Sequence, residues 1–469
     1  MTYIEGLVVL SIGLMSGTSM DGIDAALLRT DGSEKVLQEL GHTSVSYPSE
    51  FKILLKAAEY AIRKSSGHIE KARAYFQQAI KDYLNNELKM SELDCARTTK
   101  KLSIYLHGSD MPITLDEVIQ HSTKLHADAV KKLLEETKHT AEQIDVVGYH
   151  GQTMFHKPSK GISIIVGDGQ YLADQIGITV VNDFRSRDVE SGGQGAPFAP
   201  LYHQALAIRD KKIPVAVVNC GGIANITLIK DNVDVNLIAF DTGPGNGLVD
   251  RLIRQRTNGK ENMDTDGNYG KKGTVNEAVL KALYKKAIVK DGHNYFSMQP
   301  PKSLDIGDME LIAELESLSL EDACATLEAF TADTIVDSLE LLKMELPRNW
   351  ILAGGGWNNP VIRQELEKRL NQKIKGGVQI KTADEVGWNS QALEAQIFAY
   401  LAVRSLKNKP LSFPGTTRVS KPMSGGHAYI PKKGTTKIVS QLVKENPNVL
   451  WGYKEKGSQS RTQTLVLGT

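Results

Sequence analysis

The sequence predicts an α/β fold in two lobes, and three observations support this. The chain has 469 residues, two to three times the usual length of one domain. Apolar runs typical of strands alternate with helical patterns along most of the chain, which is characteristic of α/β architecture. Its 41 glycines gather between those runs, where loops are expected.

The chain opens with a strand, a short polar loop and a second strand. The apolar run 7–14 meets the loop 15–22, and a second apolar run, 23–28, ends at the turn dipeptide Asp31-Gly32. This order predicts a β-hairpin. A similar strand, Gly-Gly turn and strand occur near residue 220. We therefore expect two related lobes whose glycine-containing hairpins face each other across a cleft.

Helical patterns fill residues 50–140, as in Leu125–Leu134, where apolar positions recur three and four apart. Within them, 86–114 has weak periodicity and is interpreted as an insertion. Helices are also predicted over 361–370, after Pro360, and over 389–406. Further strands are predicted at 144–149, 163–166, 178–181, 215–220, 223–229, 237–240, 350–352 and 378–380.

The predicted division is an N-terminal lobe over 1–208, a C-terminal lobe over 209–430 and a tail over 431–469. Lys plus Arg number 56 and Asp plus Glu 55, a net charge of +1. That balance argues against a nucleic-acid or anionic-membrane binder. Three cysteines without a CxxC pair favour a reducing, cytoplasmic compartment. No apolar run is long enough to span a membrane.

The first candidate site is the loop of the N-terminal hairpin. Small residues let backbone N–H groups approach an anion, hydroxyl groups add donors, and Asp21 supplies a hard oxygen for Mg²⁺. A tight hairpin turn with solvated polar residues is an equal alternative. The loop residues concerned are Gly17, Thr18, Ser19, Met20, Asp21 and Gly22.

The second candidate is Asp241, which ends an apolar strand and opens the sequence DTGPGN, with Gly243 and Asn246 in the same turn. A carboxylate held at such a point is suited to act as a general base. A Gly-Pro turn whose aspartate caps a helix is the plainer alternative. An aspartic protease presents its carboxylate similarly, but it needs two such aspartates, and no second Asp-Thr-Gly or Asp-Ser-Gly occurs.

Two further loops carry polar side chains that are long enough to contact a carbohydrate. One carries His150 and Gln152, and the other carries Asp183, Arg185 and Gln194. Alternatively, the first loop carries polar side chains that only hydrogen-bond within the protein, and the second loop is an ion-paired surface loop. His150 and His156 are poorly spaced for a metal site.

Two glycine clusters and one acidic residue complete the set. The clusters favour close approach of a nucleotide to the backbone, although ordinary strand-to-helix connections would look the same. Neither a Walker A loop nor a strand-linked GxGxxG is present. The residues are Gly221, Gly222, Gly354, Gly355, Gly356, Asn359 and Glu394.

The chain contains, in this order, the motifs GLMSGTSMDGID, GYHGQT, NDFR, GGQGAP, NCGGIAN, FDTGPGN and AGGG. Together these motifs resemble those of the anhydro-N-acetylmuramic acid kinase family, which includes levoglucosan kinases. The resemblance runs through most of residues 10–405. It implies the two-lobed architecture of sugar kinases, heat-shock ATPases and actin, with ATP and Mg²⁺ in the cleft. It also implies a homodimer.

By this resemblance, Asp241 matches the catalytic aspartate of the family. Residues Gly17–Gly22 match the loop that binds the phosphates of ATP. Asp21 and Glu394 match the acidic residues near the metal. Gly221, Gly222, the glycines 354–356 and Asn359 match ATP-binding positions. The expected activity is a carbohydrate kinase that opens a 1,6-anhydro bridge and phosphorylates O6. The expected substrate is 1,6-anhydro-N-acetylmuramic acid, with levoglucosan as the rival.

The chain departs from the family in two places. The stretch before His150 is several tens of residues longer than in bacterial relatives. After the family-like Pro300–Ser303, the chain has Leu304–Asp308 where relatives usually carry Thr-Gly-Arg-Glu. No nearby residue of the sequence replaces that arginine's bidentate fork. A catalytically degenerate ATP-binding protein is therefore a further alternative, which the joint presence of Asp21, Asp241 and Glu394 opposes.

Overall fold

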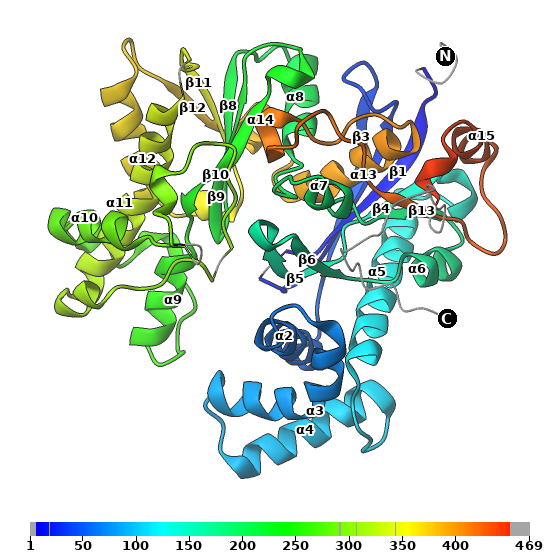
Figure 1. Ribbon diagram of the computed structural model, residues 1–469, viewed down its shortest axis with the longest axis horizontal. Coiled ribbons are helices and arrows are strands. Elements are labelled where there is room, and N and C mark those ends of the chain that lie inside the picture. The colour runs from blue at the N-terminus through cyan, green and yellow to red at the C-terminus, as the bar shows by residue number, and fades with distance from the viewer. Residues whose placement is uncertain (1–5, 18, 290–291, 306, 343, 451–469) are drawn as a thin grey trace. The chain divides into compact units, whose positions relative to one another are not determined.

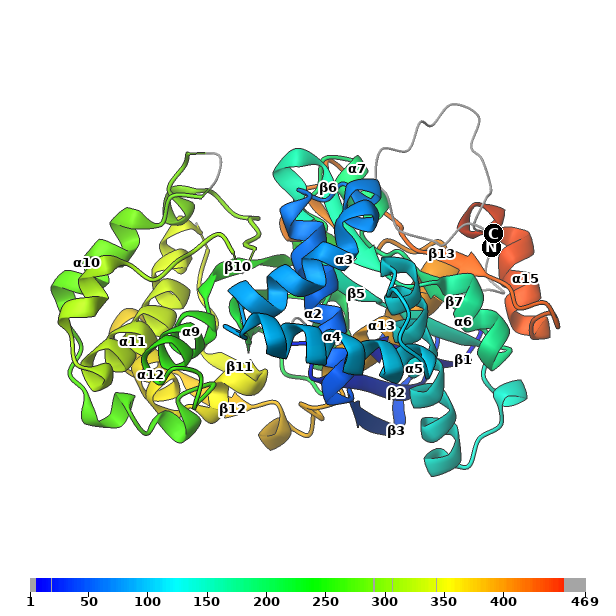
Figure 2. The ribbon, with the colours of Figure 1, turned by 90° about the horizontal axis from the view of Figure 1, so that it is seen from below.

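The computed structural model describes residues 6–17, 19–289, 292–305, 307–342 and 344–450. Its residues form two units (Figures 1 and 2). Unit 1 contains 1–195, 392–412 and 422–469, and unit 2 contains 196–391 and 413–421. The mixture of sheets and helices confirms the α/β fold class.

Unit 1 has a sheet of six strands among its described residues, in the order β13-β7-β4-β1-β2-β3. β1, β2 and β3 form an antiparallel meander, β4 and β7 continue parallel to β1, and β13 is antiparallel at the edge. Separately, β5 and β6 form a hairpin. The strands are β1 Val9–Met15, β2 Gly22–Thr30, β3 Leu37–Ser46, β4 Val146–Tyr149, β5 Gln152–Lys157, β6 Ile162–Val166, β7 Thr179–Asn182 and β13 His427–Tyr429.

Helices of unit 1 cover this sheet and extend beyond it. In Figure 1, α2, α3 and α4 gather away from the sheet, and the long α5 runs from that group toward the strands. The excursion expected over 86–114 contains α4. The helices are α2 Ser49–Lys64, α3 Ile69–Asn86, α4 Glu92–His107, α5 Leu115–Thr137, α6 Gly169–Ile176, α7 Ser186–Glu190, α13 Leu393–Leu406 and α15 Lys437–Glu445.

Unit 2 repeats the arrangement of the first five strands of unit 1. Its described strands follow the order β10-β9-β8-β11-β12, with an antiparallel meander of β8, β9 and β10 and with β11 and β12 parallel to β8. The two glycine-containing hairpins, β1–β2 and β8–β9, therefore hold the same place in their sheets. This agrees with the prediction of two related lobes.

The strands of unit 2 begin and end close to the predicted limits. They are β8 Val215–Cys220, β9 Ile223–Ile229, β10 Ile238–Pro244, β11 Asn349–Ala353 and β12 Gln379–Thr382. The helices are α8 Pro200–Arg209, α9 Gly247–Arg256, α10 Glu277–Lys286, α11 Leu320–Ser338, α12 Pro360–Lys373 and α14 Pro414–Thr417.

Helix α13 belongs to unit 1, whereas the sequence placed it in the second lobe. The reason is close packing on the first sheet. A Cβ atom on Gly13 of β1 would lie 1.8 Å from the carbonyl oxygen of Ala395, and one on Gly148 of β4 would lie 2.0 Å from that of Phe398. Only glycine at these two positions lets the helix backbone lie against the strands.

The described part of the expected tail also groups with unit 1. It contains α15 and ends against α13, where the Asn446 side-chain amide donates to the Ser405 carbonyl oxygen at 3.2 Å. Residues 451–469 lie outside the described residues.

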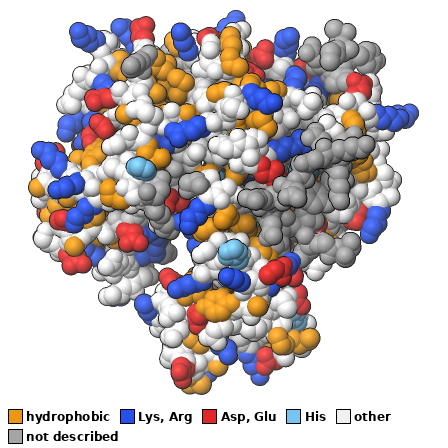
Figure 3. All heavy atoms as spheres, viewed as in Figure 1, with side chains coloured by type: hydrophobic (Ala, Val, Ile, Leu, Met, Phe, Trp, Pro, Cys, Tyr) orange, Lys and Arg blue, Asp and Glu red, His pale blue; other side chains and the backbone are white. Residues whose placement is uncertain are grey.

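Charged side chains of both signs are interspersed over the face shown in Figure 3, as the near-zero net charge implies. In the part of the chain that the structure describes, no helix has both the length and the apolar character to cross a bilayer.

The packing of α13 gives a stability prediction. We expect Gly148→Ala to destabilise unit 1 by about 1–3 kcal/mol, because the new methyl group must displace the helix backbone. Chemical denaturation measures this. Gly6→Ala is the matched control, since a Cβ at Gly6 meets nothing within 4 Å. Equal stability of the two variants would contradict the packing argument.

Candidate active site

The loop between β1 and β2 is fixed by hydrogen bonds from three directions. Gly17 accepts at its carbonyl oxygen from the Met20 N–H at 3.1 Å and from the Gln152 amide at 3.1 Å. The Ser16 hydroxyl donates to Gln152 Oε1 at 2.7 Å and accepts from the Tyr47 hydroxyl at 3.1 Å. The contacts with Gln152 and Tyr47 thus fix the shape of the loop.

Gln152, predicted to contact substrate, binds the loop through both ends of its amide group: the oxygen accepts from Ser16 and the nitrogen donates to Gly17. These contacts make it a support for the loop, and its contact with substrate stays a prediction. Met20 is buried with a positive φ of 56°, a strained conformation for a side-chain-bearing residue. Thr18 lies outside the described residues.

The carboxylate of Asp21 is largely exposed, at 74% of its side-chain surface, and lies 3.3 Å from the Lys52 ammonium. An exposed pair of this kind contributes little to stability. Asp21 is thus accessible from solvent.

Glu394, at the start of α13, lies among charged groups that the sequence only partly predicted. Solvent reaches its side chain, yet protein atoms crowd it. This desolvation is the main cause that raises the pKa of Glu394; the Asp24 charge raises it further, and the Arg185 charge lowers it. Asp24 of β2 accepts a hydrogen bond from the Ser44 hydroxyl.

Sequence reasoning missed Asp24, although it stands three residues after Asp21 in the same motif. Its pKa is raised, mainly by burial, against the effects of Ser44 and His42. The Asp24 charge disfavours ionisation of Glu394, and a divalent cation bound by such a pair of carboxylates would relieve the repulsion. Among the described residues, no group of three or more metal-binding side chains occurs.

His150 follows β4 and holds Arg185. Its Nδ1 lies 2.8 Å from the Gly151 carbonyl oxygen, which requires a proton on Nδ1. Its Nε2 therefore accepts from Arg185 Nη2, 3.0 Å away. Burial, then the Arg185 charge, lower the pKa of His150 to about 3. The imidazole is neutral near pH 7 and positions Arg185, whose charge acts on Glu394.

The carboxylate of Asp183 is engaged within its own loop. One oxygen accepts from the N–H of Ser186 at 3.3 Å and from its hydroxyl, and the other lies 3.2 Å from His427 Nδ1. These contacts favour a structural role for a residue predicted to bind substrate. Gln194 is half-buried in the loop after α7.

In unit 2, the turn that begins at Asp241 packs on the loop of the second hairpin. The carbonyl oxygens of Gly221 and Gly222 accept three N–H groups of the turn at 2.9–3.2 Å. The register of β10 against β9 shifts between Asp241 and Gly243, and such bulges often re-aim a side chain beside an active site. The donors are Gly245, Asn246 and Gly247.

Asp241 is buried, and backbone groups hold it from the segment 302–304. Its N–H donates to the Lys302 carbonyl oxygen at 2.9 Å, and its Oδ2 accepts from the Leu304 N–H at 2.8 Å. The Tyr295 hydroxyl donates to the Asp241 carbonyl oxygen at 2.6 Å. The sequence predicted Asp241 but none of these three partners, which lie more than fifty residues away.

Asn246 and Asn359 have different surroundings. The Asn246 amide donates to Asp250 at 3.1 Å, and its buried Oδ1 accepts no hydrogen bond within the described residues. Asn359 caps α12 by accepting from Val361 N–H at 3.0 Å, and it donates to Glu328 at 2.6 Å. The second residue is therefore a helix cap, with Pro360 at the first helical position as predicted.

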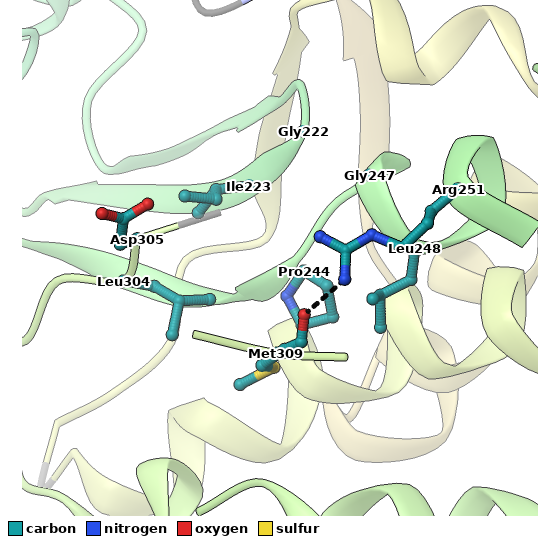
Figure 4. A pocket seen from close by; sticks show the side chains of 9 residues that line it. All are labelled: Gly222, Ile223, Pro244, Gly247, Leu248, Arg251, Leu304, Asp305 and Met309. Atoms are coloured by element: carbon teal, nitrogen blue, oxygen red, sulfur yellow. Dashed lines mark hydrogen bonds between the residues drawn. The ribbon is translucent and has the colours of Figure 1, made fainter. Parts of the chain in front are cut away.

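A small pocket lies beside Asp241 within unit 2 (Figure 4). Arg251 reaches into it from α9, and its Nη1 donates to the Met309 carbonyl oxygen at 3.2 Å, while Asp305 lies on the opposite side. The sequence indicated that nothing near Leu304 replaced the missing arginine. Arg251 lies there although it is distant in sequence. The lining residues are Gly222, Ile223, Pro244, Gly247, Leu248, Arg251, Leu304, Asp305 and Met309.

A model of the family described as "Anhydro-N-acetylmuramic acid kinase" matches residues 9–100 and 97–431. The chain belongs to this family. It is therefore a carbohydrate kinase that acts on an anhydro-sugar, as the motifs predicted. The two matched segments meet within α4, in the stretch interpreted as an insertion.

Bacterial relatives named anhydro-N-acetylmuramic acid kinase match almost end to end. That of Methylobacterium nodulans is 40% identical over 89% of this chain and 98% of its own length. That of Azorhizobium caulinodans is 39% identical over 90% and 99%. That of Rhizorhabdus wittichii is 40% identical over 90% and 99%.

Solved structures match at much lower similarity. Component A of the (R)-2-hydroxyglutaryl-CoA dehydratase of Acidaminococcus fermentans is 12% identical with a TM-score of 0.39, over 84% of this chain and 99% of that one. A glucokinase of Streptomyces griseus is 13% identical with a TM-score of 0.34, over the same shares.

The neutral His150 gives a pH prediction. Its folded pKa of about 3 lies below the ordinary 6.5, so the unfolded chain takes up the proton first. Stability is full above pH 6.5 and is lost as the pH falls from there toward 3, by at most about 1.4 kcal/mol per pH unit. We expect His150→Gln to reduce the loss of stability between pH 7 and pH 5.

Urea unfolding at the two pH values measures this effect. His68→Gln, at an exposed position, is the control. An unchanged pH dependence in His150→Gln would show that this imidazole is not held neutral in the folded protein.

Proposed function

We propose that the chain converts 1,6-anhydro-N-acetylmuramic acid to N-acetylmuramic acid 6-phosphate, using ATP. The observation that carries this proposal is that hydrogen bonds from backbone groups hold Asp241 in place. The chain that shows this arrangement belongs to the kinase family described above. A carboxylate whose main chain and one oxygen are fixed has a defined direction for its other oxygen, as a general base requires.

In the proposed reaction, Asp241 takes a proton from a water molecule. The water oxygen forms a bond to the anomeric carbon, while the bond from that carbon to O6 breaks. O6 then bonds to the γ-phosphorus of ATP, and the bond from that phosphorus to the bridging oxygen of ADP breaks. Positioning and charge neutralisation supply most of the catalysis in such a transfer.

Within unit 1, the β1–β2 loop is proposed to bind the phosphates of ATP through its backbone N–H groups. We propose that Mg²⁺ is held by Glu394 and Asp24, and that Asp21 contributes through a water molecule rather than as a direct ligand. The fit rests on the repulsion between Asp24 and Glu394, which a cation would relieve. When bound, Mg²⁺ supplies positive charge against the phosphate oxygens. Within unit 2, the glycines at 221–222 and 354–356 are proposed to contact the nucleotide.

The pocket beside Asp241 supports the choice of sugar. Its lining includes Leu304, which binds the Asp241 carboxylate, and Arg251, a cation. A guanidinium group recognises carboxylates, and 1,6-anhydro-N-acetylmuramic acid carries one on its lactyl group. Levoglucosan has no lactyl or acetamido group. Asp305 in the same lining has one oxygen engaged with the Gly307 N–H at 3.2 Å.

The base assignment gives a direct test. We expect Asp241→Asn to lower turnover at least about a hundredfold while ATP affinity changes little, because the amide cannot accept the proton. ADP release and nucleotide titration measure the two quantities. Asp231→Asn, which changes a carboxylate of unit 2 outside this pocket, is the control. Turnover in Asp241→Asn within a few-fold of the wild type would remove Asp241 from the role of base.

The assignment of the sugar is tested separately. We expect ADP release with 1,6-anhydro-N-acetylmuramic acid and little with levoglucosan or ordinary hexoses. Arg251→Gln should raise the KM for the acidic sugar at least about tenfold, because the charged partner is lost. Preference of the wild type for levoglucosan would identify the alternative function.

The metal assignment gives a third test. Glu394→Gln and Asp24→Asn should each raise the Mg²⁺ concentration needed for half-maximal activity, by about tenfold, because each removes a charged ligand. Asp21→Asn should have the smaller effect. The reverse order would assign the metal to the loop carboxylate. The homodimer implied by the resemblance remains a prediction, which sedimentation of the full chain would test.

A further inference from the structure

Glu328 of α11 has a buried carboxyl group that the proposed reaction does not use. None of its surface is exposed, and glutamate is almost never fully buried unless it is paired. Its Oε1 accepts from the Asn359 side-chain amide at 2.6 Å. Its Oε2 accepts no hydrogen bond within the described residues. An ionised carboxylate is costly in such surroundings, so the arrangement favours the neutral acid.

The segment that follows Asp264 closes over this carboxyl group. Asp264 is itself buried, and its two oxygens accept from the Tyr269 N–H at 3.0 Å and the Gly270 N–H at 2.9 Å. A Cβ atom on Gly270 would lie 1.7 Å from Glu328 Oε2. Asp264 is also a hydrogen-bond partner of Glu328, and one of the two acids must carry the proton of that bond. Because Asp264 already accepts two backbone N–H groups, the proton belongs to Glu328.

Three titratable groups face the Glu328 carboxyl group. Asp264 and Lys271 face it from the segment between α9 and α10, and Cys324 faces it from α11. On the side of α12, the facing group is the neutral Asn359 amide. Burial is the largest influence and raises the pKa of Glu328 to about 8. The Asn359 hydrogen bond and the Lys271 charge lower this pKa, and the hydrogen bond and charge of Asp264 raise it.

Asn359 connects Glu328 to the glycine-rich turn that is proposed to contact the nucleotide. Its backbone N–H donates to the Gly356 carbonyl oxygen at 3.2 Å, and its side chain caps α12. On the other side the turn is open: Gly355 is exposed, and a Cβ atom there would meet nothing within 4 Å. The turn therefore has one face accessible to a ligand and another that Asn359 and Glu328 hold within the protein.

We propose that Glu328 is a positioning residue for nucleotide binding, which as a neutral acid holds Asn359 and the turn 354–359 in the shape that receives the nucleotide. This inference rests on the proposed contact between the glycines at 354–356 and the nucleotide. Glu328 exchanges no proton with the reacting groups. When it ionises at alkaline pH, its proton passes to solvent, and two carboxylates then repel each other beneath the turn.

The test is the affinity of the full chain for MgATP in a non-hydrolysable form, measured by calorimetry at pH 7 and pH 9. In the wild type, we expect the affinity to fall at least about threefold at pH 9, because only about a tenth of Glu328 keeps its proton one unit above its pKa. Glu328→Gln keeps both hydrogen bonds, since its amide accepts from Asn359 and donates to Asp264, and should lack this fall. Glu367→Gln, at an exposed position of α12, is the control and should keep it.

A second set of variants tests whether Glu328 acts through Asn359. Glu328→Leu removes both hydrogen bonds and should weaken nucleotide binding at least about fivefold at both pH values, because the Asn359 amide loses its acceptor. Asn359→Ser keeps an oxygen that caps α12 but loses the amide donor, and should weaken binding similarly. The double variant should bind about as well as either single variant, because residues that act as a unit are not additive.

Two results would overturn the proposal. One is a wild type whose affinity is equal at the two pH values, or whose fall at pH 9 is matched by Glu328→Gln. The other is a double variant whose loss is the sum of the single losses, since independent structural effects predict that result. Thermal unfolding of each variant shows whether it is folded, and if Glu328→Leu is not, the comparison of the wild type with Glu328→Gln decides.

Failure of the proposed function gives a different pattern. A wild type that binds no nucleotide would refute the kinase reaction and this inference together. If only the assignment of the base is wrong, Asp241→Asn turns over normally, while the pH dependence of nucleotide affinity still distinguishes the wild type from Glu328→Gln. If only this inference is wrong, Asp241→Asn is inactive and the two chains bind nucleotide with the same pH dependence.

Discussion

The candidate active site depends on the backbone contacts that hold Asp241. The turn after this residue is fixed by the carbonyl oxygens of Gly221 and Gly222, and its carboxylate is fixed by the Leu304 N–H. The Lys302 carbonyl oxygen and the Leu304 N–H belong to the main chain, so these two contacts do not depend on which side chains stand at positions 302 and 304. The departure from the family pattern expected at Leu304–Asp308 therefore leaves the hold on Asp241 intact.

The repeated topology of the two sheets gives each unit a hairpin loop at the same point. In unit 1, this loop is the candidate phosphate-binding loop, and hydrogen bonds with Gln152 and Tyr47 support it. Unit 2 uses its shorter Gly-Gly loop to support the turn after Asp241. The same strand–loop–strand element thus makes different contacts in the two units.

The sequence predicted most strands, the two related lobes and the residues that lie in motifs. Runs such as Val215–Cys220 are strongly apolar and bounded by glycine, so local pattern was sufficient there. It could not find Lys302, Arg251 or the Tyr295 hydroxyl, because their relation to Asp241 exists only after the chain has folded. It also could not distinguish a polar residue that faces a ligand from one that supports a loop: Gln152 and Asn359 carry the same amide in either role.

The two acidic residues proposed to act in catalysis have different surroundings. Glu394 lies among charges of both signs, because the Asp24 charge raises its pKa and the Arg185 charge lowers it. A cation from outside is proposed to relieve the repulsion between the two carboxylates. Asp241 is instead held by backbone groups: its carboxylate accepts from the Leu304 N–H, and its own N–H donates to the Lys302 carbonyl oxygen. Different environments of similar groups are how one protein assigns them different tasks. The surroundings of Asp241 and Glu394 therefore support the proposal that the first acts as the base and the second binds the metal.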